Sequence, residues 1–146
     1  MKRILISALI CGMMFAGCAS EKGEPLQYVK TELGGCNLVS NLKSDVGLEE
    51  KSDTLIITVS KESVRVFVGL NYICKDEPFK TRCEIIDNAI VMYISDVGGD
   101  YYRCRCYYTF DFIFKWQGKL NHEYKIVLND RWKGVDVIIS EGIITN

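Results

Sequence analysis

The chain has 146 residues, of which 25% are charged and 48% hydrophobic, and its formal net charge is −1. A chain of this length suits a single domain and can bury a hydrophobic core. Charges of both signs are mixed along the sequence without a basic stripe, so we expect no nucleic-acid partner.

The N-terminal segment has the organisation of a secretory signal. Lys2 and Arg3 provide a positive start, and the mostly apolar stretch over 4–15 that follows is too short to span a bilayer. We therefore expect this segment to direct export.

The sequence Phe-Ala-Gly-Cys at 15–18 closes this segment. It resembles the lipobox of bacterial lipoproteins, although Phe15 stands where that family usually has Leu, Val or Ile. The resemblance implies cleavage before Cys18, a diacylglycerol thioether on its sulfur and a fatty acid such as palmitate on its amine. Ala19, with no Asp at that position, resembles the outer-membrane address of Gram-negative lipoproteins.

The domain organisation follows from this signal. We expect 1–17 to be a lipoprotein signal peptide, 18–27 the lipidated cysteine with a flexible tether, and 28–146 a single β domain. The lipid on Cys18 would attach the protein to the membrane. The expected location is the outer membrane of the cell envelope, with the domain facing the periplasm or the cell surface.

Alternating apolar residues predict the first strands of the domain. One strand is expected over 54–59 and a second over 64–74, where Gly69 suggests a bulge or a bend. The segment 28–39 fits either a short strand or an irregular stretch. The segment 83–94 fits a hairpin whose two-residue turn is Asp-Asn at 87–88.

The strongest alternation in the chain runs from Cys104 to Trp116 and predicts the central strand. Further strands are expected over 122–128 and 135–139, and no segment sustains a helical period. Several strands at short spacing favour an all-β fold, an antiparallel sandwich of immunoglobulin-like or related Greek-key type. A small β-barrel is the alternative.

Five cysteines follow the signal, and an oxidising compartment favours disulfides. Cys74, Cys104 and Cys106 are in phase with the apolar faces of their strands, and Cys83 joins them in the hairpin register. We expect Cys74 and Cys83 to pair with Cys104 and Cys106 in some order, leaving Cys36 free. Buried thiols or a tetrahedral metal site are the alternatives.

Motifs of catalysis are absent from the sequence. His122 is the single histidine, and we interpret it as a residue at the margin of the core rather than as a base for a cysteine nucleophile. Asp96 and Asp100 flank two glycines, which predicts a turn, with a calcium loop as the alternative. We expect no enzyme and no cofactor.

Tyrosines near the Cys-x-Cys pair offer a possible ligand platform. Tyr101, Tyr102 and Tyr107 are the candidates, and Tyr107 faces outward if its strand is regular. Such a platform can hold sugars or peptides. The alternative is that these tyrosines only cover the sheet surface or an edge.

A Cys-x-Cys pair that leads into a strand of alternating Tyr, Asp and Phe is similar to small β-sandwich lipoproteins of anaerobic Gram-negative bacteria. The matching residues are Cys104, Cys106, Tyr107, Asp111 and Phe112. This resemblance implies location and fold but no activity. The sequence thus favours an envelope lipoprotein that is a non-catalytic binding module for a protein or glycan; the alternative is an inhibitor of secreted proteases.

Overall fold

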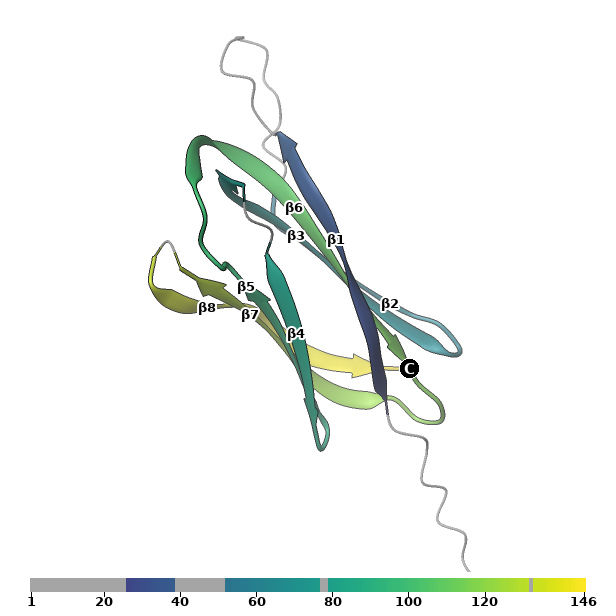
Figure 1. Cartoon of the computed structure of the whole chain (residues 1–146). Helices are drawn as coiled ribbons and strands as arrows, with labels where there is room; N and C mark the ends of the chain where they lie inside the picture. The colour runs from purple at the N-terminus through teal and green to yellow at the C-terminus, as the bar shows by residue number, and fades with distance from the viewer. Residues whose placement is uncertain (1–25, 39–51, 77–78, 132) are drawn as a thin grey trace, which may run out of the picture.

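A computed structural model describes residues 26–38, 52–76, 79–131 and 133–146 (Figure 1). These residues form strands and no helix, as expected from the lack of a helical period. The strands are β1 (Gln27–Leu38), β2 (Thr54–Val59), β3 (Ser63–Lys75), β4 (Lys80–Ile86), β5 (Ala89–Ser95), β6 (Tyr101–Lys115), β7 (Asn121–Asp130) and β8 (Val135–Thr145).

The strands form two four-stranded sheets that pack as a sandwich. Sheet A has the order β1-β6-β3-β2, and sheet B has the order β4-β5-β7-β8. In Figure 1 sheet A lies at the upper right and sheet B at the lower left. The predicted β-sandwich is confirmed, and the alternative of a small closed barrel is wrong because the sheets remain separate.

β6 is an interior strand of sheet A, as its alternation predicted. It pairs antiparallel with β1 on one side and with β3 on the other. Its core-facing rings, those of Phe110, Phe112 and Phe114, are at most 1% exposed. Burying such a side chain contributes roughly 1.5–3 kcal/mol each, so this strand anchors the core.

The β4–β5 hairpin of sheet B has the predicted register. Ile85 lies opposite Ile90 and Cys83 opposite Met92. Asp87 in the turn has a φ of 52°, a left-handed conformation that Asp tolerates better than most residues. The phase of the apolar residues and the turn residues together predicted this hairpin.

β5 and β7 run parallel, which differs from the antiparallel pairing that we expected throughout the sandwich. Ile90 lies opposite Tyr124 and Ile94 opposite Leu128. Parallel neighbours need a long crossover connection. Here β6 is that crossover, because the chain leaves sheet B after β5, crosses sheet A and returns as β7.

Of the bulge or bend that the sequence suggested at Gly69, the bulge is wrong. The pairing of β3 with both of its neighbours continues through Gly69 without a shift, and the irregularity on β3 lies between Ile73 and Cys74. Glycine is required at position 69 for another reason, which is the close approach of the Tyr107 ring from β6.

Both sheets contribute to one core. Phe79, between β3 and β4, packs edge-on against the rings of Tyr72, Tyr108 and Phe110 at centroid distances of 5.0–5.4 Å. Such aromatic contacts add to the energy of burial alone. The fully buried aliphatic side chains around them include Val64, Val66, Val68, Ile90, Met92, Ile94 and Ile126.

Candidate functional site

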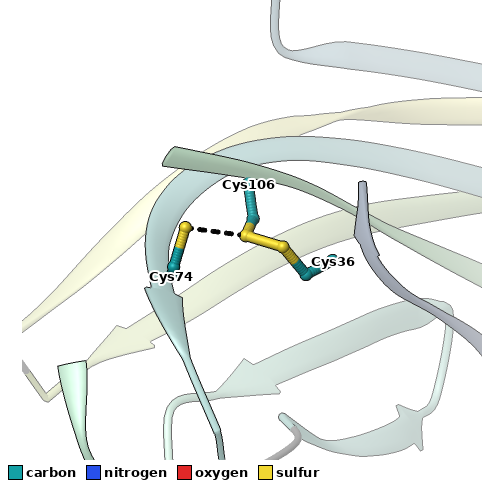
Figure 2. Close-up of side chains that lie close together, drawn as sticks. All are labelled: Cys36, Cys74 and Cys106. Atoms are coloured by element: carbon teal, nitrogen blue, oxygen red, sulfur yellow. Dashed lines mark hydrogen bonds between the residues drawn. A yellow bond between two sulfur atoms is a disulfide. The ribbon is translucent and has the colours of Figure 1, made fainter. Parts of the chain in front are cut away.

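Four cysteines from β1, β3 and β6 converge in sheet A. We call Cys36, Cys74, Cys104 and Cys106 the cysteine cluster. Disulfides join Cys36 to Cys106 and Cys74 to Cys104. The Sγ atoms of Cys36, Cys74 and Cys106 all lie within 4.8 Å of one another. Figure 2 shows these three sulfur atoms in a row, with that of Cys106 in the middle.

The two disulfides lie side by side. The Sγ atoms of Cys106 and Cys74, which belong to different disulfides, are only 2.9 Å apart, the contact drawn as a dashed line in Figure 2. This is shorter than the roughly 3.5–4.0 Å of ordinary non-bonded carbon contacts. The Sγ atoms of Cys74 and Cys106 are therefore direct neighbours, although they belong to different disulfides.

The expected cysteine pairing is correct in part. Cys74, Cys104 and Cys106 are in disulfides, and the two members of the Cys-x-Cys pair bind different partners. The assignments of Cys36 and Cys83 are wrong, since Cys36 is bonded and Cys83 is free. The reason is the sheet assignment: β1, which carries Cys36, pairs with β6 in sheet A, whereas Cys83 lies in sheet B.

The cysteines of the cluster differ in their access to solvent. Cys36 lies exposed on the edge strand β1, and Cys104 is partly exposed. Cys106 and Cys74 are 0% and 4% exposed. The free thiol of Cys83 is half-buried, and burial, followed by the charge of Glu84, raises its pKa to about 12. At neutral pH this thiol therefore stays protonated and is a poor nucleophile.

A buried ionic network adjoins the cluster through Lys75, the residue after Cys74. The Lys75 ammonium donates to Asp96, and both side chains are fully buried. The other donors to the Asp96 carboxylate are the Tyr72 hydroxyl at 2.8 Å, the Tyr101 hydroxyl at 2.9 Å and the Gly98 amide at 2.8 Å. Although burial alone would raise the pKa of Asp96, these hydrogen bonds hold it below its ordinary value.

Asp130 brings a second carboxylate to this network. The Tyr72 hydroxyl lies 2.6 Å from Asp130 Oδ1 as well as 2.8 Å from Asp96, so its single proton serves one carboxylate at a time. Burial, together with these two carboxylates, raises the pKa of Tyr72. The Lys133 ammonium lies 3.6 Å from Asp130 Oδ2, which has no hydrogen-bond partner among the described residues.

The alternative of a calcium loop at Asp96 and Asp100 gains no support from this geometry. Asp96 points into the protein, where the Lys75 ammonium already neutralises it. Asp100 is exposed, and its amide donates to Asp76. The Asp96 carboxylate is therefore committed to the buried network, and the segment between the two aspartates is a turn that leads into β6.

The three candidate platform tyrosines do not form one exposed surface. Tyr102 is 50% exposed, whereas Tyr101 is partly buried with its hydroxyl on Asp96. The expected exposure of Tyr107 is wrong, because this residue is only 2% exposed. Its ring lies against the backbone of Gly69 on the neighbouring strand. Tyr107 therefore covers the sheet surface, which was the alternative to a ligand platform.

His122 lies half-buried at the start of β7, opposite Ile144. Burial lowers its pKa. It belongs to sheet B, while the cysteine cluster lies on three strands of sheet A. The structure therefore places it at the margin of the core, as the sequence indicated.

The edge strand β8 carries exposed aliphatic side chains. Val135 and Ile138 are each 51% exposed, Val137 is 36% exposed and Ile143 is 63% exposed. β8 pairs with β7 along one side and is the last strand of sheet B. Its other side therefore presents backbone donors and acceptors that no described strand pairs with.

Searches of protein-family models, curated proteins and solved structures found no match to this chain. Cys18 and the tether lie outside the described residues, so the predicted lipidation stays a prediction. None of the described segments forms a helix with the length and apolar character needed to cross a membrane.

Proposed function

We propose that this chain is a lipid-anchored protein of the cell envelope whose β-sandwich is a non-catalytic interaction module, and that it binds a protein partner along the free edge of β8. The anchor is supported by the lipobox-like sequence at 15–18, after a charged and then apolar start. The observation that supports the binding role is the exposed aliphatic character of β8.

Edge strands of natural sheets are usually protected by charges, because an unpaired edge recruits other strands. β4, at the opposite edge of sheet B, follows this rule with Lys80, Arg82 and Glu84 on its outward face. β8, at the other edge, exposes Val135, Val137, Ile138 and Ile143 in addition to the charged Asp136 and Glu141. An extended segment of a partner can add to such an edge through main-chain hydrogen bonds, with pockets for its alternate side chains giving specificity.

A shallow groove on the face of sheet B adjoins β8 and would hold the part of the partner that lies over the sheet. It lies across β5, β7 and β8, and its lining includes Val91, Lys125, Glu141 and Ile143. Aliphatic side chains and charges of both signs meet there. The partner segment that fits is therefore extended and mixed, with apolar residues separated by polar ones.

The test is capture from the envelope fraction of the source cells, with the purified domain as bait. We expect a partner to be retained by the wild-type bait and by Ile56→Lys, but lost with Ile138→Lys. Ile56 is a matched control, because it is 52% exposed on β2, an edge strand of sheet A, against 51% for Ile138. Retention by the Ile138→Lys bait, or a glycan ligand that this change does not affect, would overturn the proposed surface.

Anchoring has a separate test. Cells that express the full chain are grown with a labelled fatty acid. The label should be incorporated into the protein, and the protein should be found in the membrane fraction. Cys18→Ala should abolish both, because it removes the thioether site. Label that persists in Cys18→Ala would show that the anchor lies elsewhere.

A further inference from the structure

We propose that the cysteine cluster is a thiol–disulfide exchange site, in which an external dithiol converts the two disulfides into a single Cys74–Cys106 disulfide and leaves Cys36 and Cys104 as thiols. This activity is independent of the β8 surface. The exchange is stoichiometric, because each chain takes up one pair of electrons from one dithiol molecule.

The positions of the sulfur atoms support this exchange. A thiolate displaces a sulfur from a disulfide by attacking along the axis of the bond. In Figure 2 the sulfurs of Cys74, Cys106 and Cys36 follow one another in that order, and the Cys74–Cys106 distance is 2.9 Å. A thiolate at Cys74 therefore faces Cys106 with Cys36 as the leaving group on the far side.

The exposures of the four residues fit the same direction of transfer. Cys104 is partly exposed and can receive an external thiolate, whereas Cys74 and Cys106 are buried. Cys36 is exposed on the edge strand β1, where a departing thiolate meets solvent. The site thus has an entrance at Cys104, a buried centre and an exit at Cys36.

The steps balance in atoms and electrons. A thiolate of the dithiol bonds to Cys104 Sγ, which breaks the Cys74–Cys104 disulfide and releases the Cys74 thiolate. That thiolate bonds to Cys106 Sγ, which breaks the Cys36–Cys106 disulfide and releases the Cys36 thiolate. The second thiol of the dithiol then attacks the dithiol sulfur that is bonded to Cys104. This breaks the mixed disulfide, releases the Cys104 thiolate and leaves the dithiol as a cyclic disulfide.

The products are one oxidised dithiol, one Cys74–Cys106 disulfide and thiols at Cys36 and Cys104, which carry the two protons of the dithiol. The free thiol of Cys83 does not compete in these steps, because it lies in sheet B and its pKa is raised. The retained disulfide is the buried one, which joins the adjacent strands β3 and β6.

Limited reduction of the full chain carrying Cys18→Ala tests this exchange, with dithiothreitol as the dithiol and iodoacetamide to block thiols. Trypsin separates the four cysteines, because Arg103 and Arg105 flank Cys104. In the one-disulfide species we expect the peptide 66–75 linked to 106–115, with Cys36 and Cys104 alkylated. A remaining Cys74–Cys104 or Cys36–Cys106 disulfide in that species would overturn the proposal.

Two single variants test the same product without a reductant. In Cys36→Ser, we expect Cys106 to take Cys74 as its partner and Cys104 to become alkylated. In Cys104→Ser, the matched variant at the other end, we expect the same Cys74–Cys106 disulfide and an alkylated Cys36. Alkylation of Cys106 in Cys36→Ser, or of Cys74 in Cys104→Ser, would overturn the proposal.

Discussion

The ring of Tyr107 on β6 lies so close to Gly69 on β3 that a Cβ atom at Gly69 would come within 1.8 Å of the Tyr107 hydroxyl oxygen and 2.3 Å of its Cζ. The two residues are on neighbouring antiparallel strands, since Gly69 pairs with Thr109 and Asn71 with Tyr107. Glycine weakens a strand because it has no side chain to pack. Here the tyrosine ring fills the space that glycine leaves, which explains why Tyr107 is buried on the face that points away from the core.

Gly69→Ala should therefore destabilise the domain, although alanine is usually better tolerated than glycine within a strand. The added methyl group must displace a rigid ring, so we expect a loss of about 1–3 kcal/mol in unfolding free energy. In a Tyr107→Ala background the same change should cost less than about 0.5 kcal/mol, because the ring is gone. Urea unfolding of the four members of this cycle measures the coupling. Equal costs in both backgrounds would contradict the contact.

The thiol of Cys83 should resist alkylation in the folded protein. Burial raises its pKa to about 12, so its thiolate is scarce at pH 8. Iodoacetamide at pH 8 should leave the tryptic peptide 83–103 unmodified under native conditions and modify it within minutes in denaturant without reductant. The cysteines in disulfides should stay unmodified in both samples. Rapid native labelling of Cys83 would show that β4 opens readily.

The ionic network should make stability depend on pH below the ordinary titration range of aspartate. Since the pKa of Asp96 is lowered in the folded chain from its ordinary value of 3.8, the group contributes stability above pH 3.8. That contribution is lost as the pH falls further, through the lower folded pKa. Unfolding free energy measured between pH 7 and pH 2 should therefore decline in this acidic window.

Tyr101→Phe isolates one of the hydrogen bonds that hold the Asp96 carboxylate. We expect it to lower unfolding free energy by about 1 kcal/mol at pH 7, and we expect the difference from wild type to shrink below pH 3.8. Tyr102→Phe is the control, because Tyr102 is 50% exposed, and it should change stability by less than about 0.5 kcal/mol at either pH. If the unfolding free energy lost in Tyr101→Phe were the same at pH 7 and below pH 3.8, the contribution of Tyr101 would not depend on the charge of Asp96.

The Cys36–Cys106 disulfide ties the edge strand β1 to β6 across 70 residues of sequence. Replacing both cysteines with serine should lower unfolding free energy by about 2–4 kcal/mol, because the unfolded chain regains the freedom that the bond removed. Hydrogen exchange should also rise in β1 before it rises in β3. Cys83→Ser, which breaks no disulfide, should leave the exchange of β1 unchanged. Similar exchange in β1 with and without the disulfide would show that strand pairing alone holds it.

Local signals predicted most of the sheet structure. The alternation of β3 and β6 and the turn at Asp87 placed these strands and the hairpin register, because both depend on residues close in sequence. The parallel pairing of β5 with β7 had no such signal. It depends on β6 crossing to the other sheet, and an alternating strand looks the same whichever direction its neighbour runs.

The candidate site was predicted only in part, and the reason is again the partner strand. The phase of a cysteine shows which face it occupies but not which sheet, so Cys83 seemed equivalent to Cys74. Cys36 lies on β1, whose pattern is interrupted by two register shifts, and alternation could not assign it. The ionic network was missed because Lys75 and Asp130 resembled ordinary ends of strands, and only tertiary packing buries them.

The pairing of the first strand with the sixth has a consequence for the order in which disulfides form on the proposed export route. In an N-to-C transfer to the oxidising compartment, Cys36 on β1 arrives before Cys74 on β3, and both arrive before β6, the strand that pairs with β1 among the described residues. In that interval Cys106, the native partner of Cys36, is still absent. A transient Cys36–Cys74 disulfide is therefore an expected early mispairing, and the arrival of β6 supplies the cysteine that resolves it.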